Sequence, residues 1–180
     1  IYVIVGLALV LIYVFVKIYN DFKKYGNAAD ATLGQIKVSM KKRFDLVEQL
    51  LGAVKGYVKH EREIFTSIAK LRAGIDSNAA DSLGDLENQS RTITGSLLAV
   101  AEAYPDLKAS ENVQELSETI VELEDEIARH RYTYNNIVQQ YNTMQDTIPS
   151  NLVAGPAGAK KLGYLEFDEK IESPPDISVN

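Results

Sequence analysis

Two Tyr-Asn pairs stand seven residues apart in the stretch RYTYNNIVQQYNT, which covers residues 131–143. The phenol of Tyr134 or Tyr141 could serve as a general acid or base in an active site. No base accompanies either tyrosine, however, and seven residues is the repeat of a packed seam between helices. A buried tyrosine contributes a large apolar surface and a hydroxyl that needs a partner. We therefore predict that both tyrosines are seam residues. Asn135 and Asn142 are placed at the flank of the seam, where their amides can bond across helices.

The two histidines, His60 and His130, are the other candidates for chemistry. The stretch HEREI at residues 60–64 begins like the zinc-binding motif H-E-x-x-H, but Ile64 stands where the second imidazole is required. His130 lies in an otherwise apolar seam, which favours a hydrogen-bonded core histidine over a metal ligand paired with Glu61. The chain has no cysteine, no glycine-rich phosphate loop and no Ser-His-Asp set. The sequence thus predicts no catalytic residue, no cofactor, no metal site and no enzyme activity.

Charge gives a weaker signal. The formal net charge of −6 argues against nucleic acid as the main ligand. A basic cluster, KVSMKKR at residues 37–43, lies about 36 Å along a straight helix from Lys17, far beyond the ~8 Å over which salt screens charges. Contact with acidic lipid is therefore disfavoured, and the alternatives are a solvated face or a protein partner. The acidic stretch ELEDE at residues 122–126 offers the opposite charge, for example on a neighbouring chain.

The first residues of the sequence predict a membrane anchor. Ile1 to Val16 contains no charge, and with the next residues this run is long enough to span most of a bilayer. A signal peptide is the alternative, but no small-residue cleavage site follows the run. Lys17, Lys23 and Lys24 come directly after it, and positive charge of this kind tends to remain cytoplasmic. We expect a single-pass protein of the cell membrane, anchored by residues 1–19, with the rest of the chain in the cytoplasm.

The remainder of the chain shows helical periodicity. We predict an all-α fold, in which the N-terminal transmembrane helix precedes an antiparallel, coiled-coil-like bundle of three long helices. A juxtamembrane connector is expected at 20–27, the bundle at 28–148 and a non-helical tail, docked on the protein, at 149–180. The three bundle helices are expected at about 28–73, 78–104 and 110–148. The seam of the third helix is predicted to include Ile127, His130, Tyr134, Ile137, Tyr141 and Met144.

The unequal lengths of these helices suggest an interface. The first bundle helix would be about 66 Å long and the second only about 40 Å. The second helix therefore cannot cover the membrane-proximal part of the first, which still carries a stripe of apolar residues. Such an open seam usually marks an interface. The candidate residues for self-assembly are Leu33, Ile36, Met40 and Phe44.

Three stretches together resemble the LemA family: DLVEQLLGAVKGYVKHE at 45–61, AEAYPDLKASEN at 101–112 and YNNIVQQYNTMQDTIP at 134–149. The tandem Tyr-Asn pairs followed by proline carry most of this resemblance, and the downstream NLVAG adds to it. It covers most of the chain, from about Tyr19 to Phe167. It implies a prokaryotic, single-span membrane protein with a helical-bundle domain, and it supplies no catalytic residues.

The function expected from these observations is structural. The chain is predicted to be a membrane-anchored scaffold or adaptor of the LemA type, which self-assembles and organises partners at the membrane. The alternative is a regulatory accessory subunit of a membrane enzyme such as a protease. The expected partners are the lipid bilayer, further copies of the chain and another membrane protein, but not nucleic acid.

Overall fold

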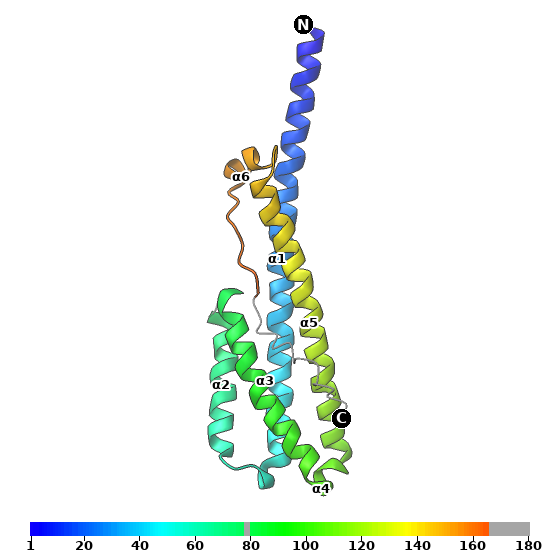
Figure 1. Cartoon of the computed structure of the whole chain (residues 1–180), viewed down its shortest axis with the longest axis vertical. Coiled ribbons are helices and arrows are strands. Elements are labelled where there is room, and N and C mark those ends of the chain that lie inside the picture. The colour runs from blue at the N-terminus through cyan, green and yellow to red at the C-terminus, as the bar shows by residue number, and fades with distance from the viewer. Residues whose placement is uncertain (78–79, 166–180) are drawn as a thin grey trace, which may run out of the picture.

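The computed structural model describes residues 1–77 and 80–165, and within these ranges the chain forms helices and no strands (Figure 1). The all-α class predicted from periodicity is thereby confirmed, as is the long apolar helix at the N-terminus. The elements are, in chain order, α1 (Tyr2–Val54), the 3₁₀ turn η1 (Lys55–Tyr57), α2 (Glu61–Ser77), α3 (Ala80–Ala103), α4 (Pro105–Lys108), α5 (Glu111–Asp146) and α6 (Asn151–Ala157).

Helix α1 runs without interruption from the apolar segment to the far end of the bundle, a length of about 80 Å (Figure 1). Residues 20–27, which were expected to form a juxtamembrane connector, continue this helix. Gly26 disfavours a helix by about 1 kcal/mol, but the ring of Tyr141 lies against it, 3.6 Å from where a Cβ atom would stand. Packing against α5 thus outweighs the local preference.

The predicted helix at 28–73 is divided in two, which is the largest departure from expectation. Helix α1 ends at Val54, and the chain turns through η1 and His60, whose φ of 65° is left-handed, before α2 begins. Gly52 and Gly56 flank this turn and weaken helix propensity there. The apolar pattern continues through the turn because Val54 and Ile68 are both buried in the same core. Periodicity alone could not show that the helix reverses.

Helices α1 and α5 form the axis of the molecule, and they lie side by side along most of the bundle (Figure 1). At the end far from the N-terminus, α2 and α3 complete a four-segment arrangement with them. Helix α5 agrees with the predicted 110–148 to within two residues, and α3 ends one residue before its predicted boundary. The start of the second predicted helix, at residues 78–79, lies outside the described residues.

The seam of α5 keeps the predicted positions Ile127, Tyr134 and Tyr141, but the buried residues between them lie one position further along the helix than predicted. The buried positions of α5 are Val113, Leu116, Ile120, Leu123, Ile127, Arg131, Tyr134, Val138, Tyr141 and Asn142. His130, Ile137 and Met144 are only partly buried, and Ile137 and Met144 pack against the core from its edge. A straight helix drifts about 20° per heptad away from a strict seven-residue repeat, and the shift absorbs that drift.

The apolar face proposed as an oligomer interface is covered within the chain itself. Ile36, Met40 and Phe44 are almost completely buried, and Leu33 packs against the same core. The second helix alone is too short to cover these residues, but α5 continues beside α1 well past the level at which α3 begins (Figure 1). Burial of each large apolar side chain stabilises the folded chain by roughly 1.5 to 3 kcal/mol. These four residues therefore belong to the core of the monomer.

The tail is partly helical, contrary to the prediction for 149–180. Helix α6 spans Asn151–Ala157, and Gly158 ends it with a left-handed φ of 67°. Val153 and Ala157 are buried against Phe22 and Tyr141, which explains why a segment containing glycine and proline folds as a helix. After α6 the chain runs without regular structure to Leu165, which is buried. The expectation for residues 166–180 lies outside the described part of the chain.

Candidate functional site

Asn135 and Asn142 bind the backbone of the returning tail. The side-chain amide of Asn135 donates from Nδ2 to the carbonyl oxygen of Leu165 at 3.1 Å, and its Oδ1 accepts from the amide of Leu165 at 2.9 Å. Asn142 makes the same pair of bonds with Leu162, both at 2.9 Å. Each asparagine thus satisfies both backbone groups of one tail residue, as a neighbouring β-strand would. We call these two asparagines, with Tyr134, the tail clamp.

The spacing of the clamp matches the spacing of the tail. Seven residues of α5 cover about 10.5 Å, and three residues of extended chain from Leu162 to Leu165 cover about 10 Å. The tail runs antiparallel to α5, because Asn142 holds the earlier residue and Asn135 the later one. The seven-residue period of the Tyr-Asn pairs is therefore matched to an extended segment of this same chain.

The two tyrosines are buried, as the seam interpretation requires. Tyr134 donates its hydroxyl to the carbonyl oxygen of Gly163 at 3.2 Å, which adds a third contact to the tail. Tyr141 packs edge-to-face with Phe22 of α1, with ring centroids 5.7 Å apart. The prediction that the asparagine amides bond across helices is wrong, because their partners are in the tail.

A charged layer lies inside the bundle, where the sequence analysis expected only surface charge. Arg43 belongs to the basic cluster at 37–43, yet its side chain is 0 % exposed, and burial lowers its pKa. Its Nη1 lies 3.8 Å from Glu124 of α5. Arg131 of α5 donates to Glu87 of α3 at 2.9 Å. This layer therefore links α1, α3 and α5 at one level of the bundle.

Burial of the Arg43 side chain costs folding free energy, although the same side chain links α1 to α5. None of its three guanidinium nitrogens has a hydrogen-bond acceptor among the residues that the structure describes. A buried charge without full hydrogen bonding is destabilising, so we expect the charged layer to add little to the free energy of unfolding. Buried ion pairs can instead specify a single alignment of helices. The charged layer lies where α1, α3 and α5 must be aligned along their axes.

The basic and acidic stretches meet within one chain. Besides the contact of Arg43 with Glu124, the hydroxyl of Ser39 donates to Glu126 at 2.8 Å. This hydrogen bond lowers the pKa of Glu126, and His130, whose Nε2 lies 3.6 Å away, adds to the effect. The two stretches of opposite charge therefore meet between α1 and α5. The other histidine, His60, lies at the turn before α2, near Glu63.

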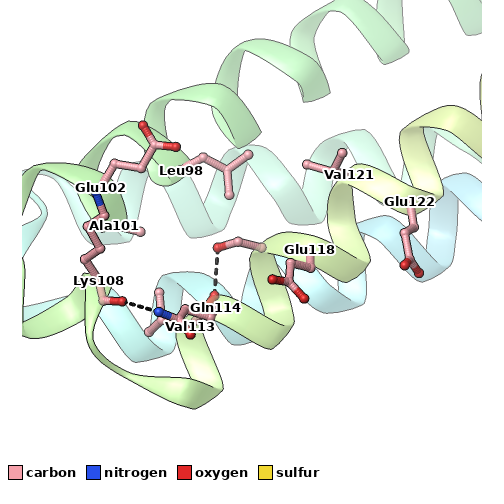
Figure 2. Close-up of a pocket in the computed structure, with 10 residues that line it drawn as sticks. Leu98, Ala101, Glu102, Lys108, Val113, Gln114, Glu118, Val121 and Glu122 are labelled. Atoms are coloured by element: carbon pink, nitrogen blue, oxygen red, sulfur yellow. Dashed lines mark hydrogen bonds between the residues drawn. The ribbon is translucent and has the colours of Figure 1, made fainter.

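An open groove of about 660 Å³ lies between α3 and α5 near α4 (Figure 2). We call it the distal groove; it is lined by Leu98, Ala101, Glu102, Lys108, Val113, Gln114, Ser117, Glu118, Val121 and Glu122. Leu98 and Val121 point toward each other from the two helices, and half of the surface of Val121 is exposed (Figure 2). Gln114 donates to the carbonyl oxygen of Lys108 at 2.6 Å. Sequence reasoning missed this groove because it depends on the angle between α3 and α5.

The distal groove combines apolar side chains with carboxylates. Among the described residues, no group of three or more His, Cys, Asp or Glu side chains is placed to hold a metal ion. The carboxylates of the distal groove are spread along two helices with apolar side chains between them (Figure 2). An apolar surface with charged side chains at its edge is typical of protein–protein interfaces.

The N-terminal part of α1 forms a second exposed apolar surface. It is the single helix in the described ranges that is long and apolar enough to cross a membrane, and none of its apolar window is buried in the protein. Ile1 and Val16 are exposed, and Lys17, also exposed, is the first charge after the window. Exposed apolar residues around a whole helix are typical of a segment that meets lipid.

The fold defines a class: an all-α bundle carried on one long apolar helix that can anchor it in a membrane. Comparison with known proteins places the chain within that class. The sequence model of the LemA family matches residues 32–179, and the chain belongs to the LemA family. The resemblance noted from the Tyr-Asn pairs is thereby confirmed.

Named relatives agree with this assignment. Protein LemA of Metamycoplasma hominis is 28% identical, over 79% of this chain and 66% of the relative. Magnetosome protein MamQ 2 of Paramagnetospirillum magneticum is 24% identical, over 84% of this chain and 65% of the relative. Magnetosome protein MamQ of Magnetospirillum gryphiswaldense is 23% identical over the same shares. The chain spans about two thirds of the length of these relatives.

Proposed function

We propose that this LemA-family chain is a membrane-anchored adaptor that holds a partner protein in its distal groove. The observation that supports this function most directly is an open apolar groove with acidic residues beside it, at the opposite end of the bundle from the apolar helix (Figure 1). From Lys17 to Val54, α1 covers about 56 Å. The adaptor would hold its partner at about that distance from the bilayer, on the cytoplasmic side if Lys17, Lys23 and Lys24 set the orientation.

The shape and charge of the distal groove suggest the kind of partner. A groove between two helices, floored by Leu98, Val113 and Val121, suits an amphipathic helix that inserts its apolar face. Glu102, Glu118 and Glu122 line the groove against the single cation of Lys108. We therefore propose a helix that carries Lys or Arg beside its apolar residues. Such charges steer encounter and select the partner more than they raise affinity.

The test uses the absence of native cysteine. A single cysteine replaces Val121 in the groove, and a matched control replaces Val38, which is exposed on α1. In native membranes, a thiol cross-linker should join the groove variant to another protein and leave the control unjoined. Glu118→Lys with Glu122→Lys should abolish that product, because the charge beside the groove is reversed.

The mass of the product identifies the occupant. A product near twice the 19.9 kDa of the chain would show that a second copy fills the groove, in which case self-assembly replaces adaptor function. A heavier or lighter product that depends on Glu118 and Glu122 supports the adaptor. Equal cross-linking at Val121 and Val38 would show that the groove has no specific occupant.

A further inference from the structure

Two apolar side chains at the membrane-proximal end of the bundle stand out by their exposure. Ile148 is 82 % exposed and Leu152 is 74 % exposed. Outside the apolar run of α1, no other large apolar residue in the described ranges is as exposed. They lie where α5 gives way to α6, and water is an unfavourable environment for both.

Helix α6 is fixed by its other face. Val153 and Ala157 are buried in a cluster with Phe22 and Tyr141, and Ile18 and Tyr19 pack against that cluster. Lys23 of α1 donates from Nζ to the carbonyl oxygen of Ala157 at 2.8 Å. The exposure of Leu152 is therefore a property of a docked helix, held in place against α1.

The position of α6 along α1 brings this exposed pair to the membrane boundary. Ile18 and Phe22, which α6 contacts, lie about 1.5 and 7.5 Å beyond Lys17 along the helix axis. The headgroup region adds roughly 5 to 7 Å on each side of the hydrocarbon core. Helix α6 thus lies beside α1 at the level where lipid headgroups surround an anchored chain (Figure 1).

Cations accompany the exposed pair on both chain segments. Lys17, Lys23 and Lys24 belong to α1, and Lys160 and Lys161 follow α6. One of the five, Lys161, is paired with Asp146 at 2.9 Å. Exposed apolar side chains with lysines at the same end of the molecule are typical of surfaces that lie in the interface of an anionic bilayer.

We propose that Ile148 and Leu152 insert into the interfacial region of the same bilayer that α1 spans, so that α6 is a second membrane contact. The proposal rests on the anchoring role of α1, since the boundary at Lys17 sets the depth of α6. A second contact on one side of α1 favours tilt of the bundle toward the side that carries α6. A single spanning helix would favour no direction of tilt.

Tryptophan fluorescence can test this in the full chain, because the sequence has no tryptophan. Single-tryptophan variants Leu152→Trp, Leu7→Trp and Val121→Trp are reconstituted in vesicles that contain anionic lipid and lipids brominated at shallow or deep acyl positions. We expect Trp at position 152 to be quenched mainly by shallow bromine and at position 7 by deep bromine. Position 121, at the distal groove, should be quenched by neither.

Each outcome separates the two claims. If position 152 is as unquenched as position 121 while position 7 is quenched, the interfacial contact is wrong and the anchor stands. If position 7 is also unquenched, the anchor itself fails. A blue-shifted but unquenched Trp at position 152 would mean that protein rather than lipid covers this surface, which also overturns the proposal. Helical circular dichroism of each variant confirms that the bundle is folded.

Discussion

The two halves of the bundle cover the same pair of helices in different ways. In the half far from the N-terminus, α2 and α3 pack against α1, and the buried ion pair of Arg131 with Glu87 joins α5 to α3. In the half near the apolar segment, α1 and α5 are joined by α6 and by the extended tail. The comparison shows that an irregular segment can complete a helical core, provided that side chains satisfy its backbone.

The largest effect should come from breaking the charged layer of the distal half. Replacing Glu87 with Ala leaves Arg131 and Arg43 in the interior without that counter-charge, which should cost about 3–5 kcal/mol of unfolding free energy. Urea unfolding in lipid nanodiscs, followed by circular dichroism, measures the loss. Arg43→Met is the matched control, because it removes a buried charge with incomplete hydrogen bonding and should be neutral or stabilising. A loss in Arg43→Met as large as in Glu87→Ala would contradict this interpretation.

Next in size is the loss of one amide from the tail clamp. Asn135→Ala leaves the N–H and C=O of buried Leu165 without their partner, at a cost of about 1–3 kcal/mol. We expect the tail to be cut faster by a protease, while the helices of the distal half remain protected. Asn88→Ala, on α3, controls for the loss of an asparagine elsewhere. Unchanged cleavage of the tail would show that the clamp does not hold it.

The two tyrosines provide a matched pair with a smaller effect. Tyr134→Phe removes the hydrogen bond to Gly163 and should cost about 1 kcal/mol. Tyr141 packs against Phe22 by its ring, so Tyr141→Phe should change stability by less than about 0.5 kcal/mol. Thermal unfolding of the two variants side by side measures the difference. Equal losses of stability in the two variants would indicate that the hydrogen bond from Tyr134 to Gly163 does not stabilise the fold.

The smallest effect concerns pH. The hydrogen bond from Ser39 lowers the pKa of Glu126 in the folded chain below its ordinary value of 4.5. The stabilisation is therefore present above pH 4.5 and is lost as the pH falls through the lower folded value. Ser39→Ala should reduce stability slightly at pH 7 and converge with the unchanged chain in strong acid. The effect is small because the carboxylate is partly exposed.

Apolar periodicity was sufficient for the class of fold and for most of α5, because each buried position repeats within a helix. It failed at residues 55–60, where Val54 and Ile68 stay in phase although the chain reverses between them. It identified the apolar stripe from Leu33 to Phe44, but the sequence does not say which helix covers that face, and helix length alone gave the wrong answer. Apolar periodicity also could not identify the tail as the partner of the Tyr-Asn pairs, because the segment with Leu162 and Leu165 is extended and has no helical repeat.

The continuity of α1 has a mechanical consequence. No turn interrupts this helix between the apolar segment and Val54, so in a chain anchored as proposed above the membrane segment and the part in the bundle form one rigid lever. Transmembrane helices tilt by about 20° on average, and such a tilt swings a 56 Å arm sideways by roughly 19 Å. Changes in bilayer thickness that alter the tilt would therefore move the distal groove across the membrane surface.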